Sequence, residues 1–145
     1  MAQQNPVLEV EDLHKYYGVR GSITKALRGI SMTIYKGEFV GVMGPSGSGK
    51  TTLLNVISTI DTPTSGHVRV GGKELTSLKK RELARFRRER LGFIFQDFNL
   101  LDTLTLRENI ALALSISGTS AAEADRLVTS IARKLGIDEV MDMFP

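Results

Sequence analysis

Cysteine is absent from the 145-residue sequence, and histidine occurs only twice, at His14 and His67. Without thiols, the chain forms no disulfide and offers no thiolate to a metal ion. Two histidines are also too few for a histidine-rich metal site. A metal ion bound by this chain is therefore expected to have oxygen ligands.

Long hydrophobic runs are absent as well. No apolar stretch approaches the roughly 18–20 residues that span a bilayer, and residues 1–6 lack the charged-then-apolar layout of a signal peptide. With 41% hydrophobic and 24% charged residues, the composition is typical of a soluble globular protein. We expect a single domain, or a piece of one, in the cytoplasm.

The excess of positive charge is small, with a formal net charge of +3. The most basic segment, residues 79–90, favours a solvated helix in which Leu83, Phe86 and the stem of Arg90 pack inward. A nucleic-acid surface would carry several aromatic side chains among the basic ones, and this segment has Phe86 alone. We therefore expect a nucleotide, and no nucleic acid, as the polyanionic partner.

Residues 44–52 read G-P-S-G-S-G-K-T-T, which contains the complete pattern G-x-x-x-x-G-K-[ST]. The loop follows an apolar run at residues 38–43 and precedes a helix-compatible run at residues 53–57. In that context, glycines let backbone N–H groups and a helix N-terminus surround a phosphate chain. The alternative, a Gly/Ser-rich linker, would not lie between a buried-type strand and a helix. The predicted phosphate-binding residues are Gly44, Pro45, Ser46, Gly47, Ser48, Gly49, Lys50, Thr51 and Thr52.

Two side chains of this Walker A loop have distinct predicted roles. Lys50 reaches the β- and γ-phosphates of a nucleoside triphosphate, so we predict it to be both a binding and a catalytic residue. Thr51 supplies the hydroxyl that a Mg²⁺ ion bridging the β- and γ-oxygens needs as a protein ligand. The loop alone is shared by GTPases, small-molecule kinases, helicases, motors and transport ATPases.

Hydrophobic periodicity and turn residues predict the strands around this loop. Alternating or wholly apolar runs bounded by glycine- and proline-containing turns indicate strands, some half-buried and some buried on both faces. The expected strands cover residues 7–13, 27–35, 39–43, 67–70 and 91–95.

The expected helices follow from charge patterns and caps. A charged helix is expected at residues 78–90, and capping boxes at Thr105 and Ser120 begin two more. The second of these is expected to end at Gly136. Strands followed by helices predict a parallel core sheet with an antiparallel β layer and a helical appendage.

The segment after residues 91–95 distinguishes among the P-loop classes. The stretches G-P-S-G-S-G-K-T-T-L-L-N, P-T-S-G-H-V and G-F-I-F-Q-D-F-N-L-L-D-T-L-T-L-R-E-N-I together resemble the ATP-binding-cassette (ABC) transporter ATPases. The third stretch and the initial L-x-K-x-Y-G most resemble ATPases of bacitracin-type antimicrobial-peptide resistance exporters. Lipoprotein-release and macrolide-exporter ATPases are also similar. The resemblance runs from about Leu8 to the last residue.

The resemblance implies an α/β fold. It consists of a P-loop NTPase core with a parallel sheet, an antiparallel β layer and the start of a helical subdomain, all in truncated form. Residues 1–145 would be the N-terminal part of an ABC ATPase domain. Residues 1–97 would hold the nucleotide-binding β layer, the Walker A loop and the Q-loop strand, and residues 98–145 would begin the helical subdomain.

Gln96 matches the Q-loop glutamine of the family. The resemblance implies that its amide approaches Mg²⁺ and the attacking water, which would make it a catalytic, nucleotide-binding and metal-binding residue. The alternative is a Walker B motif that ends at Asp97. That alternative is disfavoured because Gln96 breaks the apolar run where a Walker B strand should be driest.

Tyr17 occupies the position of the aromatic residue that stacks on adenine in the family. Its neighbour Tyr16 is the alternative, with the register shifted by one residue. For residues 98–105, the resemblance implies a groove that receives a coupling helix of the membrane subunit. Ordinary helix-packing apolar residues are the alternative there.

Several motifs of the ABC ATPase family are missing from this sequence. No L-S-G-G-Q signature, catalytic glutamate or switch histidine follows the matched segments, and neither histidine can replace the switch. We therefore expect residues 1–145 by themselves to bind ATP weakly at most and not to hydrolyse it efficiently.

For the complete protein, the resemblance implies ATP binding and hydrolysis that drive an ABC exporter active in antimicrobial peptide resistance. The implied cofactors are ATP and Mg²⁺. The implied partners are a membrane permease and a second ATPase subunit, at the cytoplasmic face of the membrane. The alternatives are a non-hydrolysing ATP-binding fragment, a nucleoside kinase or a GTPase, although the sequence lacks the N-K-x-D motif that a GTPase requires.

Overall fold

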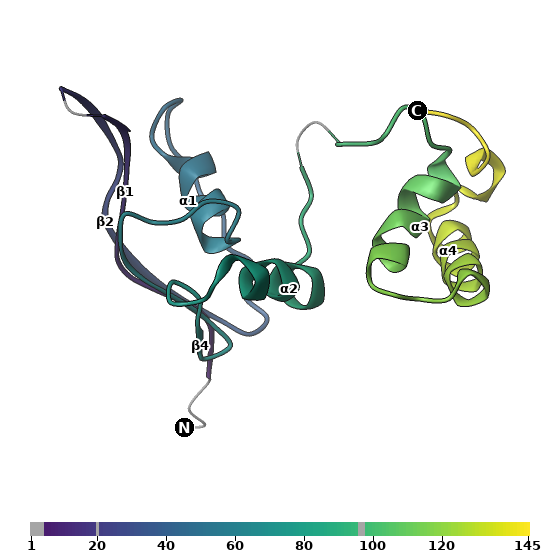
Figure 1. The fold of residues 1–145 in the computed structure, drawn as a ribbon, viewed down its shortest axis with the longest axis horizontal. Helices are drawn as coiled ribbons and strands as arrows, with labels where there is room; N and C mark the ends of the chain where they lie inside the picture. Colours follow the sequence, from purple (N-terminus) through teal and green to yellow (C-terminus); the bar gives the residue numbers. More distant parts are fainter. Residues whose placement is uncertain (1–4, 20, 96–97) are drawn as a thin grey trace. The chain divides into compact units, whose positions relative to one another are not determined.

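The computed structural model describes residues 5–19, 21–95 and 98–145. These residues form two compact units, Met1–Gly92 and Phe93–Pro145, and each unit is described by itself. Figure 1 shows the order of the elements along the chain. In the parts of the chain that the structure describes, no helix is long and apolar enough to cross a lipid bilayer.

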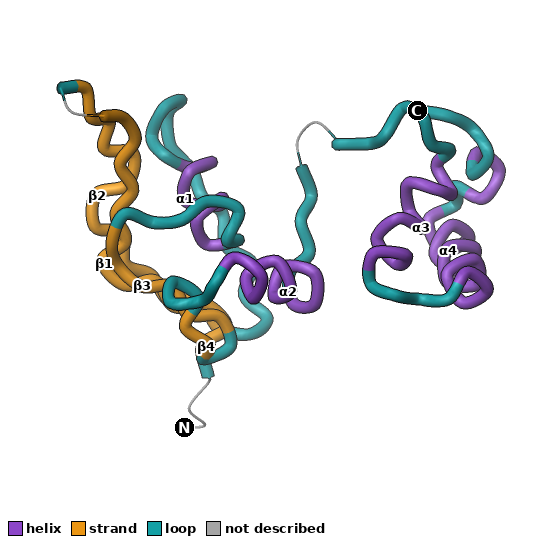
Figure 2. The backbone as a smooth tube through the Cα atoms, in the orientation of Figure 1, coloured by secondary structure: helices purple, strands orange, loops and turns teal. Residues whose placement is uncertain are grey.

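The first unit is built on a four-stranded antiparallel sheet (Figure 2). Two long strands, β1 (Pro6–Val19) and β2 (Ser22–Tyr35), form a hairpin. Strands β3 (Ser65–Val70) and β4 (Lys73–Glu74) continue the sheet on the other side of β1. The order β2-β1-β3-β4 makes β2 an edge strand. The expected antiparallel layer is present, with both hairpin strands longer than predicted because their pairing extends to the reversal of the chain.

Helices α1 (Lys50–Ile57) and α2 (Lys80–Arg90) contribute to the core of this unit. Alternation along the strands places apolar side chains on one face, and each helix buries its apolar side in the same cluster. Burying a side chain of this size stabilises the fold by roughly 1.5–3 kcal/mol relative to leaving it exposed. The buried members of the cluster are Val10, Leu13, Leu27, Leu53, Val56, Val68, Leu75 and Phe86.

Helix α2 has the solvated character that its sequence predicts. Phe86 is buried, Leu83 packs partly buried against the same cluster, and the Arg85–Glu89 pair on the exposed side is 2.7 Å apart. The prediction that the stem of Arg90 packs inward was wrong, because Arg90 is exposed. Arg87, one helical turn from Leu83, instead donates from Nη1 to the Thr59 carbonyl oxygen at 2.7 Å.

The two expected parallel strands are absent from the described secondary structure. Residues 39–43 and 91–95 form no strand, and the side chains of Phe39, Met43 and Ile94 are 92% exposed or more. A doubly buried strand requires ladder partners on its edges and layers on its faces. Among the described residues, no strand pairs with either segment. The prediction of strands there, including a buried one at residues 91–95, was therefore wrong for this structure.

The second unit is a small helical hairpin, with α3 (Leu106–Ile116), α4 (Ala121–Leu135) and a short 3₁₀ helix η1 (Asp138–Val140). Val128, Ala132 and Met141 form its buried centre. The backbone N–H of Arg107 donates to the Met141 carbonyl oxygen at 2.8 Å. This bond ties the last residues of the chain to the start of α3.

The caps of these helices follow the sequence closely. Thr105 and Glu108 form a reciprocal capping box at the start of α3. At α4 only half of the box is present, with Ser120 accepting from the backbone N–H of Glu123 at 3.4 Å. Gly136 ends α4 in the left-handed conformation at φ +68°, as predicted.

Candidate nucleotide-binding site

The Walker A loop approaches strand β2 so closely that it needs glycine. Gly49 has φ +93°, and a Cβ atom there would lie 2.5 Å from the Ala26 carbonyl oxygen and 3.3 Å from Leu27 Cδ2. Gly47, at φ +79°, also has a conformation that side chains rarely adopt. Gly49 therefore serves the packing of the loop on the sheet, whereas Gly47 serves the backbone conformation of the loop alone.

Helix α1 begins at Lys50, inside the Walker A motif and three residues before the helix-compatible run that the sequence indicates at residues 53–57. No side chain caps its first turn, and that turn contains no acidic residue. Its first backbone N–H groups and the positive end of the helix dipole are consequently available to an anion. Such a helix start, preceded by a glycine-rich loop, is a phosphate-binding arrangement.

Lys50 is half-buried at the mouth of the loop. Its Nζ atom donates to the carbonyl oxygens of Gly44 and Pro45, each at 2.8 Å. The ammonium group is thus held over the loop by two neutral acceptors. A phosphate oxygen is a stronger, charged acceptor, so a phosphate chain in the loop can draw Lys50 away from these carbonyls.

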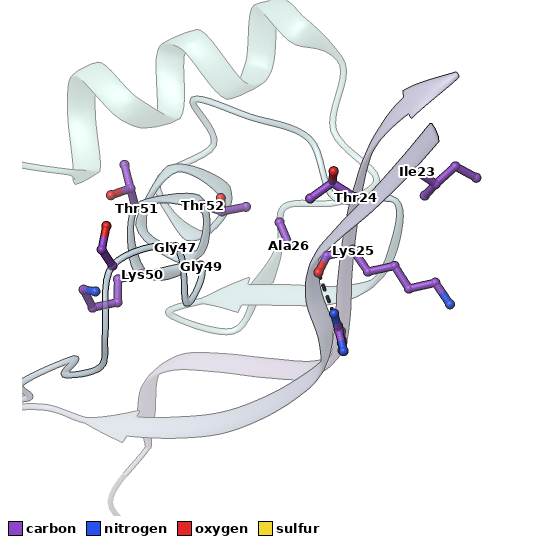
Figure 3. A pocket seen from close by; sticks show the side chains of 11 residues that line it. Ile23, Thr24, Lys25, Ala26, Gly47, Gly49, Lys50, Thr51 and Thr52 are labelled. Atoms are coloured by element: carbon purple, nitrogen blue, oxygen red, sulfur yellow. Dashed lines mark hydrogen bonds between the residues drawn. The ribbon is translucent and has the colours of Figure 1, made fainter. Parts of the chain in front are cut away.

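A cavity of about 750 Å³ opens between this loop and strand β2 (Figure 3). Its volume lies within the range of small-molecule sites, roughly 300–1,000 Å³. The loop side supplies Ser46, Gly47, Gly49, Lys50, Thr51 and Thr52, all predicted from the sequence. The strand side supplies Ile23, Thr24, Lys25, Ala26 and Arg28. Of the remaining predicted phosphate-binding residues, Gly44 and Pro45 contact Lys50, and the Ser48 backbone N–H donates to the Pro45 carbonyl oxygen at 3.2 Å.

Sequence analysis missed the strand side of the cavity. Residues 23–28 carry no motif, and their place at the loop depends on the register of the hairpin. That register sets Thr24 opposite Tyr17 and Lys25 opposite Tyr16. Tyr16 and Tyr17 identify their partner residues on β2 only when the register of the hairpin is known, and the sequence alone does not give that register.

Tyr17 lies on β1 as the cross-strand partner of Thr24, which lines the cavity. Its side chain is 42% exposed. The hydroxyl donates to Asp61 Oδ2 at 2.7 Å, and Lys15 Nζ lies 4.8 Å from the centre of the ring. The hydrogen bond to Asp61, together with slight burial, raises the pKa of Tyr17, so the phenol stays protonated and donates.

Tyr16 has different partners. Its backbone N–H donates to Thr64 Oγ1 at 2.9 Å, and its hydroxyl lies 2.9 Å from His14 Nδ1. Successive side chains of a strand point to opposite faces of the sheet. The two tyrosine side chains therefore have different surroundings, and it is the Tyr17 side chain that contacts Asp61, in the segment following α1.

Asp61 is the anion of this region. Its carboxylate accepts from Lys15 Nζ and from the Tyr17 hydroxyl, and Oδ1 also accepts from the backbone N–H of Thr62 at 2.7 Å. Partial burial disfavours the charged form. The hydrogen bonds outweigh that effect and hold the pKa of Asp61 below its ordinary value, so the group is a carboxylate at neutral pH.

The remaining predicted residues are Thr51 and those of the Q-loop. Thr51 is exposed in the first turn of α1, beside Lys50, and lines the cavity. Gln96 and its Walker B alternative Asp97 lie outside the described residues. Among the residues that the structure describes, no group of three acidic or histidine side chains is placed to hold a metal.

Sequence comparisons relate the chain to known transporters. A family model described as ABC transporter matches residues 27–145. The chain is 50% identical over 139 residues to the bacitracin export ATP-binding protein BceA of Halalkalibacterium halodurans, an alignment that covers 96% of the chain and 55% of BceA. It is 41% identical to the macrolide export ATP-binding/permease protein MacB of Marinobacter nauticus, over 87% of the chain and 20% of MacB. The chain thus spans about half the length of BceA.

A solved structure carries the same fold. The ATP-binding cassette MJ0796, in a dimeric post-hydrolysis state bound to ADP and Pi, superimposes with a TM-score of 0.86 at 34% identity, over 95% of this chain and 61% of that one. This similarity confirms the α/β P-loop fold class. A match to the family model over residues 27–145 and this structural similarity agree with each other. The chain belongs to the ABC transporter family, in its ATP-binding domain.

Proposed function

We propose that this chain is the nucleotide-binding part of an ABC exporter ATPase and that it binds ATP in the cavity between the Walker A loop and β2. The observation that carries the proposal is the junction of loop and helix. There, an uncapped helix start without acidic side chains, a lysine held by neutral acceptors and a cavity of about 750 Å³ coincide. All three features favour a polyanion of nucleotide size.

The residues of the loop divide the work of binding. The backbone N–H groups of residues 44–52 and the start of α1 hold the phosphates, and Lys50 moves from the loop carbonyls to the β- and γ-oxygens. Tyr17 offers one ring face to the adenine. The first turn of α1 contains no acidic residue, so no negative side chain there opposes the phosphate charge.

Mg²⁺ is the proposed metal. The Thr51 hydroxyl is exposed at the first turn of α1, beside Lys50, and an oxygen donor of this kind suits Mg²⁺. Gln96 is the second proposed ligand, through its amide oxygen. Thr51 and Gln96 would hold the metal, which would supply charge neutralisation at the β- and γ-phosphates, and Gln96 would also hold the attacking water.

In the complete protein, we propose that hydrolysis drives an exporter involved in antimicrobial peptide resistance. The similarity to BceA, whose name describes bacitracin export, supports this assignment over macrolide export. The proposed partners are a second ATPase subunit and a membrane permease, which would keep the protein at the cytoplasmic face of the membrane. Residues 98–105 are the proposed permease contact, and Phe98, Leu100 and Leu101 are exposed there. Residues 1–145 by themselves, without an L-S-G-G-Q segment, are proposed to bind ATP without efficient turnover.

A competition experiment tests the nucleotide. The purified chain is titrated with a fluorescent ATP analogue in the presence of Mg²⁺, and the analogue is then displaced with ATP, GTP or inorganic tripolyphosphate. Stacking on Tyr17 reads any purine face, so ATP and GTP are expected to compete with similar affinity, and tripolyphosphate more weakly. Displacement by GTP at a tenfold lower concentration than ATP would favour the GTPase alternative. Failure of all three to displace the analogue would contradict a phosphate site.

A further inference from the structure

We propose that Asp61 is a positioning residue for the nucleotide base: together with Lys15, it fixes the ring of Tyr17 in the orientation that stacks on the purine. The inference rests on the proposed function, because it concerns the same ATP site. It assigns a role to a residue that lies outside the Walker A loop and 44 positions from Tyr17 along the sequence.

The first support is the set of contacts on the Asp61 carboxylate. Each oxygen has its own partner, with the Tyr17 hydroxyl on Oδ2 at 2.7 Å and Lys15 Nζ on Oδ1 at 2.6 Å. Lys15 Nζ also donates to the Thr62 carbonyl oxygen at 2.7 Å. A hydrogen bond to an ionised acceptor is stronger than a neutral one, so both side chains are held more firmly than a neutral partner would hold them.

The second support is the arrangement around the ring. Lys15 Nζ lies 4.8 Å from the ring centroid, in the position of a cation over the aromatic face. One face of Tyr17 is therefore covered by the same lysine that pairs with Asp61. A purine consequently stacks on the other face, and the hydroxyl contact fixes the rotation of the ring relative to it.

The third support is how Asp61 is itself held. The backbone N–H groups of Ile60 and Asp61 both donate to the Asn55 carbonyl oxygen, at 2.9 and 3.0 Å. Asn55 belongs to α1, whose first residue is Lys50. The phosphate-binding loop therefore lies at the start of α1, and the residue that anchors Tyr17 is bonded to the end of the same helix. This short helix sets the distance between the phosphate site and the base site.

Anchoring matters because Tyr17 is 42% exposed on a strand near the end of a hairpin. A side chain that is free to rotate must be immobilised when it stacks on a ligand, and that ordering weakens binding. A ring that is already held binds the same base more tightly. The anchor should affect ligands that carry a base and leave ligands without one unchanged.

Variants of both partners test this role. Tyr17→Phe removes only the hydroxyl, and Asp61→Asn removes the charge while keeping the shape. Asp138→Asn, at an exposed residue outside the proposed nucleotide and permease contacts, is the matched control. Affinities for ATP and for inorganic tripolyphosphate are measured on the whole chain, with thermal melting of each variant as the check of folding. We expect Tyr17→Phe and Asp61→Asn each to lower the affinity for ATP by about 2- to 10-fold, the range for releasing one side chain. The affinity of these two variants for tripolyphosphate should equal that of the parent, and Asp138→Asn should leave both affinities unchanged.

The double variant separates positioning from a structural role. If Asp61 acts through the Tyr17 hydroxyl, the double variant Tyr17→Phe/Asp61→Asn should lose less ATP affinity than the product of the two single fold-losses. Equal losses of ATP and tripolyphosphate affinity in Tyr17→Phe would overturn the proposal, as would a loss of ATP affinity smaller than about twofold, the lower end for releasing one side chain. Binding of ATP by the parent that fails to depend on Lys50 would instead contradict the proposed function.

Discussion

At the scale of single residues, the site depends on close contacts of the Walker A loop with itself and with β2, as well as on charge. Lys50 is held by two carbonyl oxygens of its own loop, and Gly49 is held against the backbone of β2. Both contacts restrict the loop to one shape. A loop that already has its shape binds phosphate at a lower entropic cost than a disordered one.

Gly49→Ala tests the close approach. The new Cβ would lie 2.5 Å from the Ala26 carbonyl oxygen, and φ is +93°. Gly37 is the matched control, because it has φ +87° and nothing within 4 Å of the corresponding position. We expect Gly37→Ala to lower the free energy of unfolding by about 1 kcal/mol, the cost of the left-handed backbone. Gly49→Ala should cost about 1–3 kcal/mol more, because the loop must shift away from β2.

Urea denaturation of both variants provides the measurement. Equal losses of unfolding free energy in the two variants would mean that the loop does not rest on β2 as the structure has it.

At the scale of elements, the caps separate well-specified helices from weaker ones. In α3, Thr105 Oγ1 accepts from the Glu108 backbone N–H at 3.3 Å, and the Glu108 carboxylate accepts from the Thr105 backbone N–H at 2.8 Å. The Glu108 carboxylate also accepts from the Thr105 hydroxyl at 2.9 Å, and the two bonds that it accepts from Thr105 lower the pKa of Glu108. In α4 the single contact from Ser120 is 3.4 Å long. Local sequence therefore specifies the start of α3 more firmly than that of α4.

Thr105→Ala should accordingly destabilise the second unit more than Ser120→Ala. Loss of an N-cap side chain costs about 1 kcal/mol on average, and we expect Thr105→Ala to reach that value and Ser120→Ala to cost a few tenths. Far-ultraviolet circular dichroism during urea unfolding measures both. The reverse order of the two losses would contradict the assignment of the stronger cap to α3.

At the scale of the whole molecule, the sequence predicted what is local and missed what needs partners. The phosphate loop, the start of α1 and the end of α4 at Gly136 depend on residues within one or two turns of the chain, so motif and cap chemistry identified them. Residues 39–43 and 91–95 have the composition of buried strands. Composition shows only that a segment would be stable when paired, and no described strand pairs with them.

The same reasoning applies to the site. The Walker A residues were predicted because they are contiguous, whereas Thr24 and Arg28 line the cavity through the register of a hairpin. The contact between Tyr17 and Asp61 joins β1 to the turn after α1, and nothing in the local sequence of either residue indicates it. Long-range contacts of this kind require the three-dimensional structure.

The central claim is that Lys50 and the loop around it form an ATP site, and one titration tests it most directly. Lys50→Ala removes the cation that neutralises the β- and γ-phosphates, so the variant should show no detectable binding of a fluorescent ATP analogue. Lys36→Ala, at an exposed residue in the turn after β2, is the matched control and should bind like the parent. Binding by Lys50→Ala within twofold of the parent would contradict the account.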